Sequence, residues 1–308
     1  MIAFREIASG LQVPEGPVAL PDGSVLVVEI LGGCLTRIHA DGSKQRIVQT
    51  GGGPNGAAIG PDGRCYLCNN GGSDWIEHDG LRMPIAEAPE DAQPGSIQRV
   101  ALDSGRIESL YTEANGRALR APNDLVFDAH GGFWFTDYGK VHARVRDRGA
   151  VCYAHADGSF IHEVIAPLDS PNGIGLSPDG SSLYVAETYT GQILRFEIEA
   201  PGRIRSAATL ATATDATVIG RAGASRYPDS LAVDSDGYVC VATAGLGGIL
   251  VLAPDGSSSE QLALPDPLTT NICFGGPELR TAYVTFGLSG RVVALQWPRP
   301  GLSLNYAR

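Results

Sequence analysis

A short polar motif recurs six times along the chain, each time seven residues before a turn motif. The clearest copy is Pro171-Asn172-Gly173, which is followed by Pro178-Asp179-Gly180. Every copy then continues into a short run rich in β-branched and aromatic residues, such as Leu183-Tyr184-Val185. A repeat at fixed internal spacing predicts one structural unit used six times. Runs of strand-forming residues separated by tight turns indicate an antiparallel up-and-down sheet in each unit.

The lengths of the repeat units identify the fold class. From the polar residue to the turn residue, the six steps run 15 to 22, 55 to 62, 123 to 130, 172 to 179, 229 to 236 and 271 to 278. The units begin near residues 14, 54, 122, 171, 228 and 270, so their periods are 40, 68, 49, 57 and 42. A propeller blade needs about 40–50 residues, and longer units carry insertions. We therefore predict an all-β, six-bladed β-propeller with four antiparallel strands per blade, spanning residues 1–308 as one domain.

The last repeat unit lacks a fourth strand. Only three clear strand-like runs follow residue 270, so another segment has to complete the sixth blade. Residues 2–7 form a strand-like run outside any repeat, and we expect them to supply the outer strand and close the ring. The C-terminal tail, residues 301–308, is the alternative, and the sequence leaves both open.

Composition narrows the class of partner. The net charge of −11 argues against a nucleic-acid partner, which needs a basic surface. No signal-peptide pattern or long apolar run is present, so the expectation is a soluble cytoplasmic protein without a membrane partner. The six cysteines are expected to be buried thiols rather than disulfides. Cys65 and Cys68 form a C-x-x-C pattern, but strand positions three apart point to opposite faces, which disfavours a metal or redox role.

Three segments interrupt the repeat. The largest, residues 71–95, contains Trp75 and His78, which favour a packed or substrate-facing loop, although its role stays open. Residues 140–148 are rich in Lys and Arg, and we interpret them as a solvated loop. Residues 212–227 either line a pocket mouth or simply connect two blades.

The polar residues of the six motifs should gather at one mouth of the propeller channel. Each precedes an innermost strand, and innermost strands line the central channel. The six are Glu15, Asn55, Asn123, Asn172, Asp229 and Asn271. A ring of carboxylates and carboxamides suits a hard divalent cation, Ca²⁺ by preference, with Mg²⁺ and Mn²⁺ as alternatives. The competing interpretation is that Pro-Asn-Gly is only a turn signal, but a turn would not favour the Glu of the first motif.

Several motifs together resemble those of the SMP-30/gluconolactonase/luciferin-regenerating-enzyme family of six-bladed propellers, over essentially the whole chain. They are Pro14-Glu15-Gly16-Pro17, Pro122-Asn123-Asp124-Leu125-Val126, Phe135-Thr136-Asp137-Tyr138-Gly139, Ser170-Pro171-Asn172-Gly173, Leu183-Tyr184-Val185-Ala186-Glu187-Thr188 and Tyr227-Pro228-Asp229. The resemblance implies that Glu15, Asn172 and Asp229 hold a catalytic metal. It also implies that Asn123 ligates this metal or contacts substrate. Zn²⁺ and Fe²⁺ join the candidate metals.

The resemblance implies hydrolysis of a small lactone, most often a sugar lactone. We expect a metal-dependent lactonase in which the metal polarises the carbonyl and Asp229 acts as general base. One departure leaves the substrate open: Ala121 stands where sugar-lactone members often carry a polar residue, with Arg120 one place before it. Candidate substrate contacts are Asn55, Trp75, His78, Arg120, Asn123 and Asn271. The alternatives are an ester or phosphotriester hydrolase at the same metal, or a calcium-binding regulator without turnover. The oligomeric state stays open.

Overall fold

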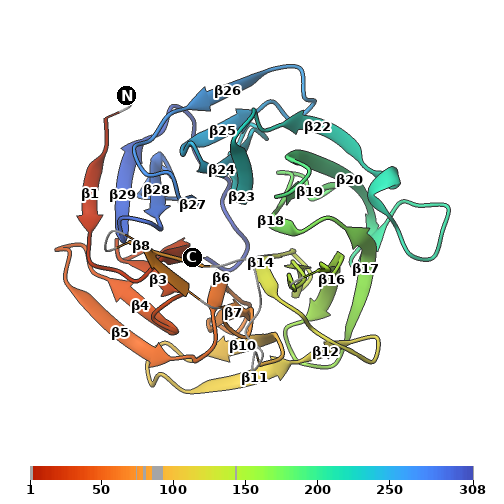
Figure 1. Ribbon diagram of the computed structural model, residues 1–308, viewed down its shortest axis with the longest axis horizontal. Helices are drawn as coiled ribbons and strands as arrows, with labels where there is room; N and C mark the ends of the chain where they lie inside the picture. The colour runs from red at the N-terminus through yellow and green to blue at the C-terminus, as the bar shows by residue number, and fades with distance from the viewer. Residues whose placement is uncertain (1–2, 74, 79–80, 85–92, 143, 308) are drawn as a thin grey trace.

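The computed structural model describes residues 3–73, 75–78, 81–84, 93–142 and 144–307. Its strands form six antiparallel sheets arranged as blades around a central axis (Figure 1). In five sheets the strand order is that of an up-and-down blade, and the fourth sheet carries an extra strand. The predicted six-bladed β-propeller is confirmed.

The first three blades follow the chain from inside to outside. Blade one contains β2 (Pro14–Ala19), β3 (Val25–Glu29), β4 (Cys34–Ile38) and β5 (Lys44–Gln49). Blade two contains β6 (Pro54–Ile59), β7 (Cys65–Asn69), β10 (Ser96–Val100) and β11 (Ile107–Tyr111). Blade three contains β14 (Pro122–Phe127), β15 (Gly132–Asp137), β16 (Gly149–His155) and β17 (Ile161–Leu168).

The other three blades contain the two departures from this pattern. Blade four has β18 (Pro171–Leu176), β19 (Ser182–Glu187), β20 (Gln192–Ala200) and β21 (Arg203–Ile204), and β22 (Thr217–Arg221) also pairs with β20. Blade five has β23 (Arg226–Val233), β24 (Val239–Gly245), β25 (Ile249–Leu252) and β26 (Ser259–Leu262). Blade six has β27 (Thr269–Gly275), β28 (Thr281–Phe286), β29 (Arg291–Gln296) and, outermost, β1 (Arg5–Ala8) from the N-terminus.

The two chain ends take different places. Strand β1 pairs antiparallel with β29, with Arg5 opposite Ala294. The C-terminal tail instead runs toward the centre of the ring (Figure 1). The Leu302 amide donates to Val233 O of blade five at 3.0 Å, and Asn305 Nδ2 donates to Phe127 O of blade three at 3.0 Å. The tail is therefore a strap between blades rather than a blade strand.

The hydrophobic core lies in six layers, one at each junction between neighbouring blades. Between blades one and two, for example, Leu26 and Leu35 pack with Ile59 and Leu67. Equivalent clusters fill the remaining junctions, including that between blades six and one. Because every blade has to bury both of its faces, no blade can be stable outside the ring.

The interrupting segments contain further short strands. Strands β8 (Trp75–His78) and β9 (Leu81–Pro84) form a hairpin in the blade-two insertion, and β12 (Glu113–Ala114) pairs with β13 (Arg117–Ala118). Residues 212–227, left open by the sequence, contain the short 3₁₀ helix η1 (Ala213–Asp215) and the blade-four strand β22.

The cysteines agree with the prediction from sequence. All six are buried and unpaired. Cys65 packs toward blade one and Cys68 toward blade three, as expected for opposite faces of one strand. In the part of the chain that the structure describes, no helix has the length and hydropathy of a membrane span.

Candidate metal centre

The six predicted ring residues all lie on innermost strands, but inside these strands rather than before them. Glu15, Asn55, Asn123 and Asn172 are each the second residue of their strand. In all six blades the pairing of the innermost strand shifts register at this point, for example between Glu15 and Val18 of β2. A register irregularity re-aims a side chain. It therefore explains how these polar groups turn toward the channel.

The glycine of the Pro-x-Gly motifs is needed for packing between blades, not for a turn. A Cβ added at Gly16 would lie 2.6 Å from Asn55 O, and one at Gly56 would lie 2.6 Å from Asn123 O. At Gly173 it would lie 2.7 Å from Asp229 O. Each glycine thus allows the next blade's ring residue to approach closely. The interpretation of Pro-Asn-Gly as a turn signal is wrong, since the triplets are parts of strands.

Four ring oxygens are buried without a hydrogen-bond partner. They are Glu15 Oε1, Asn55 Oδ1, Asn123 Oδ1 and Asn172 Oδ1. Buried polar atoms are almost always satisfied, so these four acceptors need a hydrogen-bond donor or a cation from outside the protein. All four are hard oxygen donors, which suits Ca²⁺ or Mg²⁺. These residues therefore fit the cation implied by the sequence.

Neighbouring polar groups fix the orientation of the ring side chains. Asn271 Nδ2 donates to Glu15 Oε2 at 2.8 Å, and the Gly16 amide donates to the same oxygen, which leaves Oε1 for another partner. Asn172 Nδ2 donates to Thr188 Oγ1 at 3.1 Å, which leaves the buried Asn172 Oδ1 without a protein partner. Thr188 Oγ1 in turn donates to Pro228 O at 2.8 Å and so ties blade four to the Asp229 segment.

Three buried carboxyl groups give the ring its electrostatic character. Burial, with the charges of Asp229 and Asp124, raises the pKa of Glu15 well above its usual value. Burial raises the pKa of Asp124 to about 7, and burial together with Asp124 raises that of Asp229 to about 7. Three carboxylates so close together are mutually destabilising when all are ionised. A divalent cation among them would offset this repulsion.

Asp124 was missed as a site residue by the sequence reasoning. It occupies the third place of the blade-three motif, where the first, second and fourth motifs have glycine. Its side chain fills the space that Gly56 leaves open, since a Cβ at Gly56 would lie 2.7 Å from Asp124 Oδ1. An acidic residue in a position where three of the other five motifs have glycine was the signal that could have identified it.

The ligand set is mainly carboxamide. Over the described ranges, no group of three or more His, Cys, Asp or Glu side chains is arranged to hold a metal ion. The ring instead combines Glu15 and Asp229 with Asn side chains. Such oxygen sites favour hard cations over the softer transition metals.

The predicted substrate-contact residues lie in different places. Asn55, Asn123 and Asn271 all belong to the ring. Asn271 Nδ2 donates to Glu15, whereas Asn55 Oδ1 and Asn123 Oδ1 have no hydrogen-bond partner. Arg120 lies before β14 with its side chain 60% exposed, 3.5 Å from Asp147. Trp75 is half-buried at the start of the β8–β9 hairpin. The side chain of His78 lies outside the described residues.

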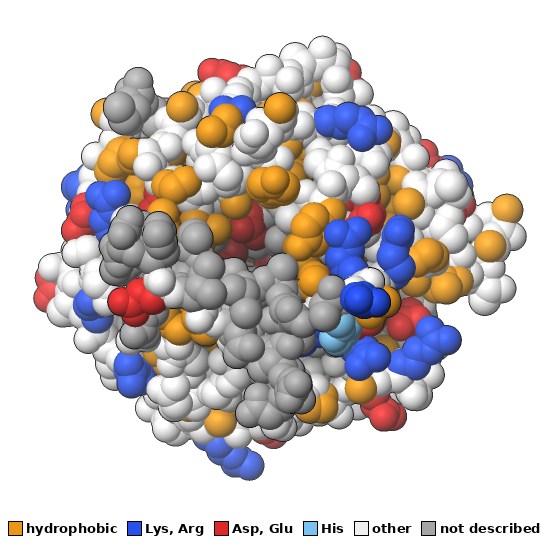
Figure 2. Space-filling model, viewed as in Figure 1, with side chains coloured by type: hydrophobic (Ala, Val, Ile, Leu, Met, Phe, Trp, Pro, Cys, Tyr) orange, Lys and Arg blue, Asp and Glu red, His pale blue; other side chains and the backbone are white. Residues whose placement is uncertain are grey.

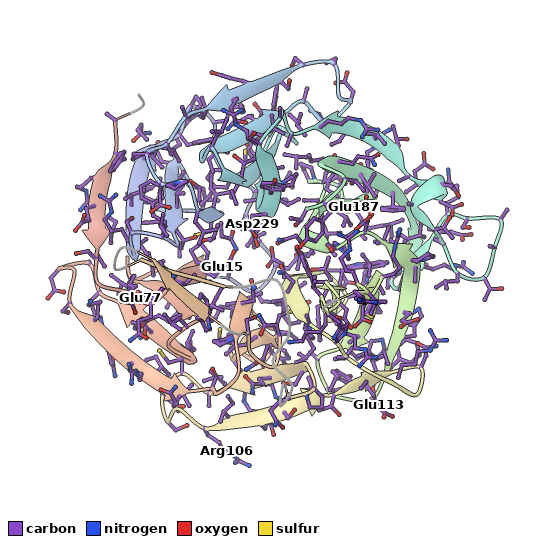
Figure 3. All side chains as sticks on the ribbon, viewed as in Figure 1. Glu15, Glu77, Arg106, Glu113, Glu187 and Asp229 are labelled. Carbon is purple, nitrogen blue, oxygen red and sulfur yellow. The ribbon has the colours of Figure 1, made fainter. Side chains whose placement is uncertain are left out.

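The ring lies at the bottom of a hollow in one face. Figure 2 shows acidic side chains in its depth and hydrophobic side chains at its margin. In Figure 3, Glu15 and Asp229 lie beside the axis, whereas Arg106 lies at the outer edge. Toward the other end of the channel, a cavity of about 320 Å³ extends from Asp124 and Asn271 to residues 302–305 of the tail.

Comparison with known families adds to this geometry. The family model described as "SMP-30/Gluconolactonase/LRE-like region" matches residues 13–287. A curated relative named lactonase drp35, from Staphylococcus saprophyticus, is 30% identical over 258 residues, which cover 83% of this chain and 71% of the relative. Its counterpart from Staphylococcus haemolyticus is 28% identical over 258 residues, with 83% and 70% covered.

Two solved structures share the fold. A gluconolactonase from Xanthomonas campestris is 20% identical with a TM-score of 0.74, covering 96% of this chain and 89% of that one. A calcium-binding regucalcin from Agrobacterium tumefaciens is 19% identical with a TM-score of 0.73, covering 98% of each chain. At these identities the likeness shows the propeller fold alone.

Proposed function

The chain belongs to the SMP-30/gluconolactonase/LRE-like family, and on that premise we propose that it is a metal-dependent lactonase. The family and the lactonase relatives support hydrolysis of a small-molecule lactone. The observation that carries the metal dependence is the set of four buried ring oxygens without partners. A sugar lactone is the first substrate to test, because Xanthomonas campestris has a gluconolactonase of this fold.

Glu15 Oε1, Asn172 Oδ1, Asn123 Oδ1 and the Asp229 carboxylate would hold the cation, with Ca²⁺ favoured by the all-oxygen set. A cation bound there supplies Lewis-acid polarisation of the lactone carbonyl and stabilises the charge that develops on its oxygen. Asn271 and Thr188 keep the Glu15 and Asn172 oxygens directed at the channel.

Asp229 would accept the proton of the attacking water. Its carboxylate is buried, and burial raises its pKa to about 7, so it is a stronger base than an exposed aspartate. The ideal general base has a pKa near the working pH. A bound cation would lower the pKa of Asp229 again. To act as both ligand and base, Asp229 would hold the cation with one carboxylate oxygen and accept the proton of the water with the other.

The test is a set of hydrolysis assays on chelated protein, before and after divalent cations are restored. The substrates are an aldonolactone, a simple δ-lactone and a phosphotriester. Activity on a lactone that disappears on chelation and returns with Ca²⁺ supports the proposal. Cleavage of the phosphotriester alone would support an ester hydrolase at the same metal. Calcium binding without any turnover would support a regulator and contradict the proposed activity.

A further inference from the structure

Blade three carries a concentration of positive charge on an acidic protein. Four of the chain's 23 Lys and Arg residues lie within residues 140–148, although the net charge is −11. We name as the basic arc these four residues together with one residue before β14: Arg120, Lys140, Arg144, Arg146 and Arg148. Figure 2 shows Lys and Arg side chains gathered beside the central hollow, on the side of blades three and four.

The basic arc is only partly neutralised. Arg146 forms an ion pair with Asp169 at 2.6 Å, and Arg148 lies 3.9 Å from the same carboxylate. Arg120 lies 3.5 Å from Asp147. Asp137 also interacts with Arg120 and Lys140. Three carboxylates therefore lie beside five cations among the described residues. The side chains of Arg120 and Arg148 remain 60% and 55% exposed, which leaves much of each guanidinium in contact with solvent.

Contacts through blade four connect the basic arc to the metal centre. The Arg146 guanidinium lies over the ring of Tyr189, 4.2 Å from its centroid. Tyr189 directly follows Thr188, whose hydroxyl holds Asn172 of the ring. Asp169, the partner of Arg146, is three residues before Asn172 in sequence. Arg146 is thus positioned at the mouth by the segments that position a metal ligand.

Exposed apolar side chains lie on the adjoining part of the mouth. Tyr189 is 42% exposed, Tyr227 is 48% exposed and Leu246 is 57% exposed. Tyr227 is two residues before Asp229, and the Leu246 amide donates to Ser225 O at 3.2 Å, which keeps this loop beside the start of β23. Exposed aromatic faces grouped beside a charged surface are typical of a ligand-binding rim.

We propose that the basic arc selects lactones that carry an anionic substituent, a carboxylate or a phosphate, and this rests on the proposed lactonase function. The substituent binds Arg146 and Arg148 while the lactone carbonyl lies at the ring, and Tyr189 and Tyr227 contact the carbon skeleton. Arginine is suited to this role because its planar donors bind carboxylate and phosphate oxygens in pairs. The arc also counters the repulsion that the acidic protein exerts on an anion.

The test compares one δ-lactone ring carrying a hydroxymethyl, carboxylate or phosphate substituent, on metal-loaded protein. We expect kcat/KM to be higher for a charged lactone than for the neutral one, and to fall with added salt. The ratio of kcat/KM for the charged lactone to kcat/KM for the neutral lactone should drop about tenfold in Arg146→Gln and in Arg148→Gln. A hydrogen bond to a charged group contributes about a factor of ten in affinity. The two charged substrates distinguish carboxylate from phosphate recognition.

Arg106→Gln is the matched control, because it removes the same charge at the outer edge of blade two (Figure 3). It should leave the ratio unchanged. Arg148→Gln guards against a folding effect, since it keeps the ion pair between Arg146 and Asp169. Melting temperatures equal to that of the unsubstituted protein establish that the variants are folded.

A binding measurement separates this proposal from the proposed activity. A tetrahydropyran carboxylate and its neutral amide cannot be hydrolysed as lactones, and calorimetry measures their binding. If no lactone is cleaved but the carboxylate binds and Arg146→Gln abolishes binding, the lactonase proposal fails and the anion site stands. If lactones are cleaved with no preference for charge, or if the ratio is the same in every variant, the anion site is wrong.

Discussion

Glu15 and Asp229 are the two carboxylates proposed to hold the cation, and only Asp229 is also proposed to accept a proton. Glu15→Gln keeps an oxygen donor but removes a charge, so we expect weaker metal binding and activity that recovers at high metal concentration. Asp229→Asn also keeps a donor, but an amide has no basic lone pair near neutral pH. Its activity should therefore stay lower by about 10²–10⁴-fold at saturating metal. The measurement is kcat as a function of metal concentration for both variants.

Full recovery of both variants would show that Asp229 is only a ligand. Asn271→Asp is a useful comparison, because Asn271 contacts Glu15 rather than the open part of the ring. Asn271→Asp replaces the amide that donates to Glu15 with another carboxylate, so Glu15 loses this hydrogen bond. The new carboxylate should not act as a base toward the attacking water.

The raised pKa values of the ring carboxyls predict a dependence of stability on pH in metal-free protein. Asp124 and Asp229 have pKa values of about 7 in the folded state, raised by burial from 3.8. The folded state then binds protons more tightly than the unfolded chain, so its stability should fall as pH rises from about 4 to about 7. Urea unfolding of chelated protein at pH 5 and pH 7.5 measures this.

Calcium should remove this dependence of stability on pH, because a bound cation keeps the carboxylates charged. The quantity to compare is the difference in unfolding free energy between calcium-saturated and chelated protein. Groups that titrate in both forms do not contribute to this difference; one such group is His162, whose pKa is lowered by burial. The same difference at both pH values would contradict the proposed coupling of cation and carboxyls.

At the level of single residues, the sequence identified the ring but not its chemistry in full. Glu15, Asn172 and Asp229 could be found because the repeat marks equivalent positions. Asp124 was not found, because it occupies the third place of its motif, and that place is not polar in most copies of the repeat. The hydrogen bond from Asn271 to Glu15 joins residues 256 positions apart, and only the closed ring brings them together.

Strand β1 is the only part of blade six that comes from the N-terminal end of the chain, among the strands described. Deleting residues 2–7 would remove most of this strand and expose the edge of β29. We expect a lower melting temperature and a tendency to associate through that edge. Thermal unfolding and size-exclusion chromatography measure the two effects. A truncated protein that melts like the full chain would show that the pairing of β1 with β29 does not stabilise the ring.

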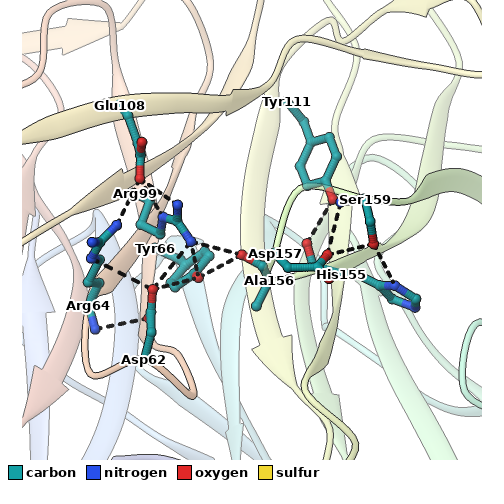
Figure 4. Close-up of polar contacts among 10 residues, drawn as sticks. All are labelled: Asp62, Arg64, Tyr66, Arg99, Glu108, Tyr111, His155, Ala156, Asp157 and Ser159. Carbon is teal, nitrogen blue, oxygen red and sulfur yellow. Dashed lines mark hydrogen bonds and ion pairs between the residues drawn. The ribbon is translucent and has the colours of Figure 1, made fainter.

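Arg99 of strand β10 joins blades two and three away from the ring (Figure 4). Its Nη1 donates to Ala156 O at 3.1 Å, and its Nε donates to Glu108 Oε1 at 2.7 Å. Arg99→Ala removes both bonds, although Tyr66 Oη still donates to Ala156 O and Arg64 Nη1 still donates to Glu108 Oε1. We therefore expect a loss of about 1–2 kcal/mol in unfolding free energy. Arg106→Ala, on an exposed neighbouring position, is the control. Equal stability of the two variants would contradict this assignment.

Blade boundaries followed from the sequence because each blade starts with the same polar motif. The additional strand β22 did not, since residues 217–221 resemble a connection in composition and become a strand only through pairing with β20. The sequence also left open which chain end completes blade six. Pairing with β29 depends on where the ring brings each end, and local propensity does not encode that.

For the whole molecule, the cation and the ring should stabilise each other. The proposed ligands come from blades one, three, four and five, so the site exists only in the closed propeller. Ca²⁺ at 100 times its Kd should therefore raise the unfolding free energy by about 2.7 kcal/mol, or the melting temperature by roughly 5 °C. Differential scanning calorimetry after thorough chelation measures the shift. No shift with any divalent cation would rule out the ring as a metal site.

The C-terminal tail bears on how molecules travel through this propeller. Residues 302–305 border the cavity at the far end of the channel, and their bonds to Val233 and Phe127 hold them between two blades. The tail therefore narrows the far end of the central channel. A lactone and its hydroxy-acid product would then exchange mainly through the hollow above the ring, and bound product would delay the entry of the next substrate.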